Sequence, residues 1–180
     1  MLSILAFSYD KVYVVNRDKN IYLKKVDRLV FNIGVTKYKL DLLNEKIDIN
    51  YIHENREKKI SDVKKLPEYR EYRYEVKRLD RYYNMCSKLP DSIADDIQYK
   101  KLKDKISRTR GIYNRFVNIE NQFIEGGYNR KAFTKDFEKE YRSFVNSYNE
   151  LQSYSEHLKT QLVDLGFEKD DAVNEEASDD

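Results

Sequence analysis

Cysteine, proline and glycine are scarce in this chain of 180 residues, and tryptophan is absent. The single cysteine, Cys86, excludes an internal disulfide and a metal site built from several cysteines. Its place on an apolar helical stripe predicts a small buried hydrophobic side chain. With two prolines and five glycines, the composition is unlike that of a β-sandwich or a doubly wound sheet. The scarcity therefore predicts a helix-rich chain with few loops.

Long apolar runs are also lacking. No run approaches the roughly 20 residues that a membrane-spanning helix needs. Residues 1–7 are apolar, but the stretch is too short for a signal peptide and lacks a basic lead. We therefore expect no membrane span, and a location in the cytoplasm or inside a particle assembled there.

The residue patterns of catalytic and metal sites are missing as well. The two histidines, His53 and His157, each lie beside a glutamate. Di-iron sites in helical bundles use Glu-x-x-His steps on two helices, and this sequence has none. Neither a glycine-rich phosphate loop nor zinc-ligand spacing occurs. We therefore expect a protein that is not an enzyme, with no catalytic residues, no metal and no cofactor.

Tyrosine and charge are abundant instead. The chain has 16 tyrosines, and 37% of its residues are charged. A buried tyrosine needs a hydrogen-bond partner for its hydroxyl or must leave it at the rim of the core. Residues 1–167 hold 33 Lys and Arg against 25 Asp and Glu, whereas residues 168–180 hold one against seven. The body is thus basic, and the acidic end is typical of a disordered tail.

Heptad spacing marks two stretches joined at Gly126-Gly127. In the second stretch, apolar residues recur at steps of four and three, with Ser155 in one slot. Such spacing keeps one stripe of a helix facing a partner helix. The predicted helix-packing seam consists of Phe137, Tyr141, Phe144, Tyr148, Leu151, Leu158, Leu162 and Leu165. The stripe before the glycines consists of Leu102, Ile106, Tyr113, Phe116 and Phe123. We expect the two stretches to fold back on each other.

Together these patterns predict an all-α fold, an elongated antiparallel bundle of about four helices in a single domain over residues 1–167. The predicted helices lie near 24–65, 68–88, 93–125 and 130–165. In the first of them, the apolar face consists of Leu29, Ile33, Leu40, Leu43 and Ile47.

Residues 11–23 allow two interpretations. They are β-branched and aromatic on both sides of a polar turn, which favours a small β-hairpin. Alternatively, they form an irregular lead into the first helix.

Basic residues crowd one part of the third predicted helix, opposed only by Asp104. They are Lys100, Lys101, Lys103, Lys105, Arg108 and Arg110. Basic side chains with nearby aromatic rings can hold a phosphate backbone and stack on unpaired bases, so this stretch is a candidate nucleic-acid-binding site. The alternative interpretation is a solvated helix face whose charges pair with neighbouring carboxylates.

Two functions follow from these features. The first is a non-enzymatic structural or interaction protein that acts through helix–helix contacts, by self-association or with a helical partner. An assembly component such as a viral particle subunit, adaptor or scaffold fits this description, and the viral option is suggested by the bias towards Tyr, Asn, Lys and Asp. The second is a nucleic-acid-binding protein, or a small protein inhibitor of a nucleic-acid enzyme, that uses the basic face of residues 100–110.

Overall fold

The computed structural model describes the backbone of residues 2–46, 62–125 and 130–164, and the side chains of 11–46, 62–122 and 135–163. The helices are α1 (Leu2–Lys46), α4 (Pro67–Met85), the short 3-10 helix η1 (Asp91–Ile93), α5 (Ile97–Glu125) and α6 (Arg130–Asp164). Within these ranges the chain forms no strand, which confirms the all-α prediction. The predicted tail, 168–180, lies outside the described residues.

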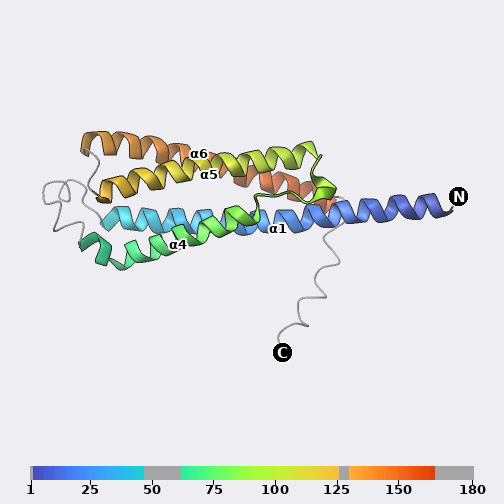
Figure 1. Cartoon of the computed structure of the whole chain (residues 1–180), viewed down its shortest axis with the longest axis horizontal. Coiled ribbons are helices and arrows are strands. Elements are labelled where there is room, and N and C mark those ends of the chain that lie inside the picture. The colour runs from blue at the N-terminus through green and yellow to red at the C-terminus, as the bar shows by residue number, and fades with distance from the viewer. Residues whose placement is uncertain (1, 47–61, 126–129, 165–180) are drawn as a thin grey trace, which may run out of the picture.

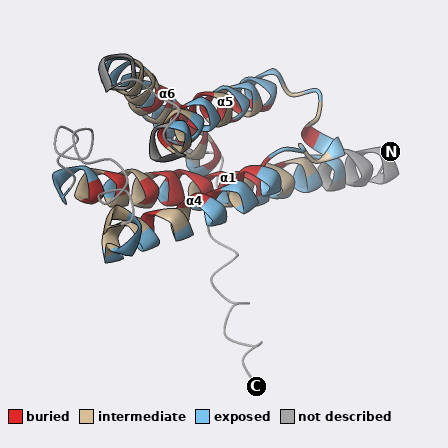
Figure 2. Ribbon diagram, turned by 60° about the vertical axis from the view of Figure 1, so that its left-hand side comes forward, coloured by how far each residue is buried: buried red, intermediate tan, exposed pale blue. Residues whose placement is uncertain are grey.

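The helices pair as two antiparallel hairpins laid one on the other. α1 packs along α4, and α5 packs along α6 (Figure 1). The main contact between the two layers joins α1 to α6, which run in opposite directions: the Tyr141 hydroxyl donates to Asp41, and Ser155 donates to Asp27. At 1.5 Å per residue, the 35 residues of α6 extend about 50 Å, so the bundle is long and thin. Buried residues line the sides of the helices that face one another (Figure 2).

Aromatic rings fill much of the space between the layers. Phe116 stacks on Phe144, with ring centroids 6.2 Å apart, and Tyr113 lies 5.6 Å from Phe144. Tyr83 of α4 reaches Tyr113 of α5 at 6.1 Å. On the other side of the interface between the layers, α4 and α5 therefore meet through long aromatic side chains, whereas α1 and α6 approach each other more closely.

The predicted hairpin at 11–23 is wrong, because these residues belong to α1, which begins at Leu2 and not near residue 24. Tyr22 and Leu23 are almost fully buried at helical spacing, and the Tyr22 hydroxyl donates to the carbonyl of Cys86 at 2.8 Å. Two isolated strands are marginal in water, whereas a helix here buries a ring against the bundle. Tertiary packing therefore overrides the local β-strand propensity.

The boundaries near the third predicted helix follow from local capping. α5 begins at Ile97 rather than at 93, because η1 precedes it and the Asp96 carboxylate accepts a hydrogen bond from the backbone N–H of Gln98 at 2.9 Å. Lys19 pairs with Asp96 at 2.7 Å and so joins this turn to α1.

Candidate interaction surface

The seam predicted on α6 belongs to the core of the bundle. Its buried members are Phe144, Leu151, Leu158 and Leu162, and its partly buried members are Phe137, Tyr141 and Tyr148. Leu165 lies outside the described residues. Ser155, in the polar heptad slot, is buried and donates to Asp27 of α1 at 3.3 Å. The seam thus packs against α1 as well as α5 and stabilises the fold, rather than offering a surface to a partner.

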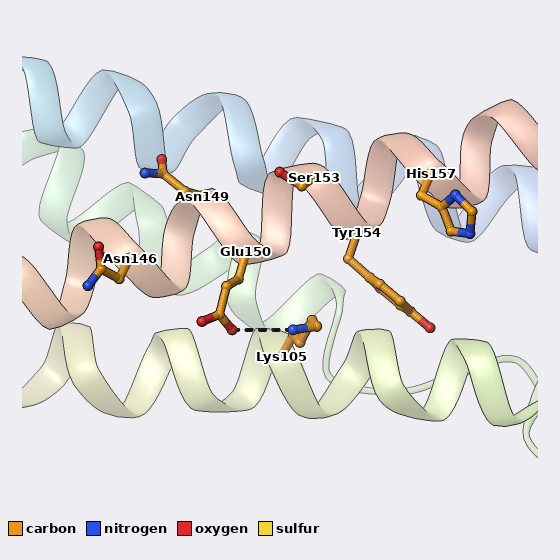
Figure 3. A pocket seen from close by; sticks show the side chains of 7 residues that line it. All are labelled: Lys105, Asn146, Asn149, Glu150, Ser153, Tyr154 and His157. Atoms are coloured by element: carbon orange, nitrogen blue, oxygen red, sulfur yellow. Dashed lines mark hydrogen bonds and ion pairs between the residues drawn. The ribbon is translucent and has the colours of Figure 1, made fainter.

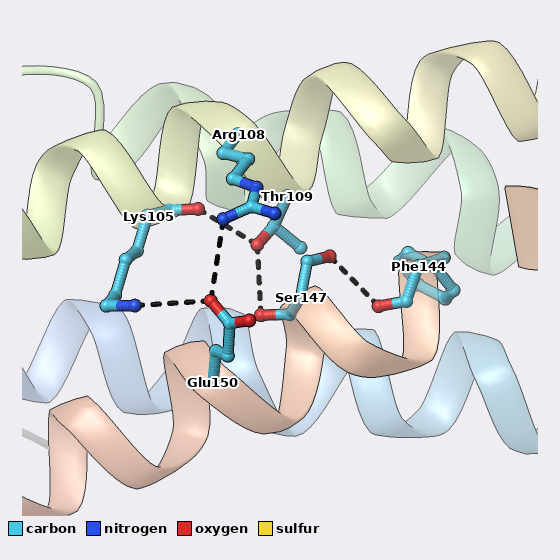
Figure 4. A network of polar contacts seen from close by, with 6 residues as sticks. All are labelled: Lys105, Arg108, Thr109, Phe144, Ser147 and Glu150. Atoms are coloured by element: carbon cyan, nitrogen blue, oxygen red, sulfur yellow. Dashed lines mark hydrogen bonds and ion pairs between the residues drawn. The ribbon is translucent and has the colours of Figure 1, made fainter. Parts of the chain in front are cut away.

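Three of the predicted basic residues lie on the side of α5 that faces α6. At about 100° per residue, Lys101, Lys105 and Arg108 fall within roughly 60° of one another around the helix. The Glu150 carboxylate lies 3.3 Å from the Lys105 ammonium and 3.6 Å from the Arg108 guanidinium (Figure 4). Both Lys101 and Lys105 place their ammonium groups 5.6 Å from the centre of the Tyr154 ring. This flank is therefore partly neutralised within the protein.

The other basic residues lie elsewhere around α5. Arg110 points towards α4, where its guanidinium lies 3.6 Å from Asp80 and 5.8 Å from the centre of the Tyr83 ring. Lys103 is partly exposed and, one heptad away, shares this side of the helix. Lys100 pairs with Asp95 at 3.0 Å. The six residues thus lie on three different sides of α5 and do not form one continuous phosphate-binding face.

A polar groove runs between α5 and α6 beside this flank (Figure 3). It is lined by Lys105, Asn146, Asn149, Glu150, Ser153, Tyr154 and His157. Glu150 projects into the groove and would repel a phosphate, while the His157 ring contacts Gln161 at 3.2 Å. In Figure 3 the His157 ring stands apart from the Lys105–Glu150 pair.

Two buried hydroxyls between α5 and α6 donate to backbone carbonyls. The hydroxyl of Thr109, which is fully buried, donates to the carbonyl of Lys105 at 2.9 Å, and the Ser147 carbonyl lies 3.3 Å away (Figure 4). The Ser147 hydroxyl in turn donates to the carbonyl of Phe144 at 3.0 Å. These hydroxyls therefore serve helix packing, since no donor capacity is left over for a ligand.

Cys86 is buried, and burial raises the pKa of its thiol to about 12, which suppresses the reactive thiolate. Among the described residues, no group of three or more His, Cys, Asp and Glu side chains is placed to hold a metal ion. None of the helices, over the residues described, is long and apolar enough to cross a bilayer.

A second heptad stripe lies on α1, on the side away from the core, and sequence analysis missed it. Phe31, Val35, Tyr38 and Leu42 follow one another at steps of four, three and four. Phe31 and Tyr38 are 69% and 59% exposed, whereas Val35 and Leu42 are partly buried. The same spacing that marked the α6 seam could have revealed this stripe, but the stronger Leu and Ile face of α1 concealed it.

The stripe continues towards the N-terminus with alternating steps of three and four. Its further members are Val14, Arg17, Ile21, Lys24 and Arg28. All five are exposed, Val14 at 40% and Ile21 at 44%. We refer to the nine residues from Val14 to Leu42 at this spacing as the α1 outer stripe. The N-terminal part of α1 also projects beyond the other helices (Figure 1).

Beside the α1 outer stripe, a shallow groove separates α1 from α6. Phe31, Val35 and Tyr38 line it from α1, and Tyr148 and Gln152 line it from α6. The Tyr148 side chain lies close over Gly34, where an added Cβ atom would be 3.0 Å from the Tyr148 hydroxyl oxygen. Glycine thus lets the Tyr148 side chain lie against the α1 backbone and gives the stripe an aromatic flank.

Comparison of the chain with protein-family models, with curated proteins and with solved structures found no match.

Proposed function

We propose that the protein is a non-enzymatic structural or interaction protein, an assembly component that acts through helix–helix contacts made by the α1 outer stripe. A particle subunit, an adaptor and a scaffold all fit this role. The observation that carries the proposal is the heptad spacing of Phe31, Val35, Tyr38 and Leu42 on the exposed side of a helix whose opposite side is already buried.

Scattered apolar residues are normal on a protein surface and need no explanation. Here, however, Phe31 and Tyr38 are among the most exposed large apolar side chains described, and they share one stripe with two further apolar positions. A surface helix ordinarily has one apolar stripe and a polar opposite face. The second stripe on α1 supports a second helix as its partner, because heptad spacing is the pattern that lets helices pack side by side.

Nucleic-acid binding, or inhibition of a nucleic-acid enzyme, is the alternative. The feature that favours it is the exposed Lys101 and the partly buried Lys105, both beside the Tyr154 ring. Against it stand the carboxylates of Glu150, Asp80 and Asp95, each of which lies within ion-pair distance of one or more of the candidate residues. Each such ion pair would have to be exchanged for a phosphate contact, so we rank this function second.

A photo-crosslinking experiment tests the proposal. The photoreactive phenylalanine analogue p-benzoylphenylalanine replaces Phe31 in the full chain, and Tyr74 of α4 in a matched control. Tyr74 is 64% exposed, close to the value for Phe31, so both probes meet solvent equally in the isolated chain.

We expect crosslinks to a protein chain from position 31 in the cells that make this protein, little or no crosslinking from position 74, and loss of the position 31 adduct when Val35→Glu is added. Equal crosslinking from both positions, or none from either, would contradict the proposed function.

A further inference from the structure

We propose that the partner of the α1 outer stripe is the same stripe of a second copy of this chain, packed antiparallel about a twofold axis at Arg28. This inference rests on the proposed function and names the partner that it leaves open. It is carried by the order of residue types along the stripe: when the stripe is reversed, its aliphatic positions coincide with aliphatic positions and its basic positions coincide with aromatic ones.

The match is visible when the stripe is aligned against itself in the antiparallel direction, centred on Arg28. Val14 then faces Leu42 of the second copy, and Ile21 faces Val35, so aliphatic residues meet aliphatic residues. The basic residues meet the aromatic ones with an offset of one residue, about 1.5 Å along the helix: Arg17 lies beside Tyr38, and Lys24 lies beside Phe31. A cation within about 6 Å of the centre of an aromatic ring is attracted to it, and the attraction is stronger where water is excluded. Twofold symmetry forms each of these pairs twice.

Other arrangements of two copies are less favourable. In a parallel pair, Arg17, Lys24 and Arg28 would each face the same residue of the other copy, and like charges along a seam repel. The antiparallel pair leaves one such contact, Arg28 against Arg28 on the axis.

The size of the stripe suits a weak, concentration-dependent dimer. From Val14 to Leu42 it runs about 42 Å at 1.5 Å per residue. A buried aromatic ring covers roughly 150–250 Å², so the exposed parts of two copies of Phe31 and Tyr38 contribute on the order of 500 Å². The aliphatic residues and the carbon stems of Arg and Lys add to this area. Together they approach the roughly 1,000 Å² at which specific interfaces begin.

Disulfide trapping tests the register. A residue on the twofold axis faces its own copy, so Arg28→Cys should form an intermolecular disulfide under mild oxidation. Val14→Cys alone should not, because its two copies would lie about 42 Å apart. A mixture of Val14→Cys and Leu42→Cys chains should crosslink to each other. The unaltered chain is the matched control, since its one cysteine, Cys86, is buried.

The mass in solution tests the dimer without an added cysteine. Sedimentation at rising concentration should show the unaltered chain doubling from 21.7 kDa, and Phe31→Glu should stay at the single-chain mass. A single-chain mass at every concentration, together with no Arg28→Cys disulfide, would overturn the dimer.

Self-crosslinking of Val14→Cys would show a parallel pair and overturn the antiparallel register. If the dimer fails while the photo-crosslinker at position 31 joins a different protein, the proposed function stands and only this inference falls.

Discussion

The hydroxyl of Tyr72 on α4 donates a hydrogen bond of 2.7 Å to the buried carboxylate of Glu120 on α5. This contact crosses the gap between the two helical layers. The Arg73 guanidinium only partly offsets the cost of burying the Glu120 carboxylate, because it donates its hydrogen bond to Asn121 at 2.9 Å instead. Burial therefore raises the pKa of Glu120 from its ordinary 4.5 to about 7, although the Tyr72 hydrogen bond and the Arg73 charge act in the opposite direction.

The Glu120 contact predicts a pH dependence of stability. Because the folded chain holds this proton more tightly than the unfolded chain, its contribution to stability is complete below about pH 4.5 and is lost as the pH rises to about 7. The loss is on the order of 3 kcal/mol. Urea unfolding at pH 5 and pH 8 measures it, with Glu120→Gln as the control that removes it. Equal pH dependence in Glu120→Gln and the unaltered chain would contradict the buried carboxylate.

Removal of a core ring should be costly. Phe144 is 1% exposed and lies against Tyr113 and Phe116, so Phe144→Ala should lower the free energy of unfolding by about 3–5 kcal/mol. Tyr74→Ala, at a 64% exposed ring, is the matched control and should change it by about 0.5 kcal/mol or less. Chemical unfolding followed by circular dichroism compares the two. Similar losses for both variants would show that the aromatic cluster is not the core.

The close approach at Gly34 predicts a coupling between two substitutions. Alanine is favoured over glycine within a helix by about 1 kcal/mol. In Gly34→Ala this gain should be offset, because the new Cβ would lie 3.0 Å from the Tyr148 hydroxyl. In a Tyr148→Phe background the oxygen is gone, and the gain should appear in full. A double-mutant cycle of unfolding free energies measures the difference. An equal effect of Gly34→Ala in both backgrounds would mean that the two helices do not meet there.

The neutralised flanks of α5 predict weak or absent nucleic-acid binding. Filter binding with mixed-sequence single-stranded RNA at low salt should give no saturable signal. If phosphates were bound, affinity would fall with salt at a log–log slope of about −0.7 per contact. Reversal of Lys101, Lys105 and Arg108 to Glu would then abolish binding. A steep salt dependence that disappears in the triple variant would favour the nucleic-acid function over the assembly function.

Sequence alone predicts the parts of this molecule that depend on helical period. The four-three spacing located the α6 seam because Phe144, Leu151 and Leu158 repeat without a competing signal. It failed at 11–23, where β-branched residues dominate a segment that the bundle holds as a helix through Tyr22.

The state of the basic residues depends on tertiary register and so could not be read from local sequence. Glu150 lies 45 positions after Lys105 in the chain, yet it neutralises that side chain across the α5–α6 contact. A run of lysines and arginines therefore shows only that charge is present, whereas its availability to a ligand depends on which carboxylates the fold brings alongside. For the α1 outer stripe, the local sequence gives the heptad spacing, but only the packing of the other helices shows that the stripe stays exposed.

Hydroxyl-radical labelling of Tyr38 relative to Tyr74 tests the role of the α1 outer stripe most directly. The two tyrosines are 59% and 64% exposed, so their labelling should be nearly equal in the dilute isolated chain. In the concentrated protein, or in the cells that make it, a covering helix should reduce labelling of Tyr38 several-fold while Tyr74 stays unchanged. A Tyr38-to-Tyr74 labelling ratio that remains near its dilute value in both settings would contradict a docking role for this face.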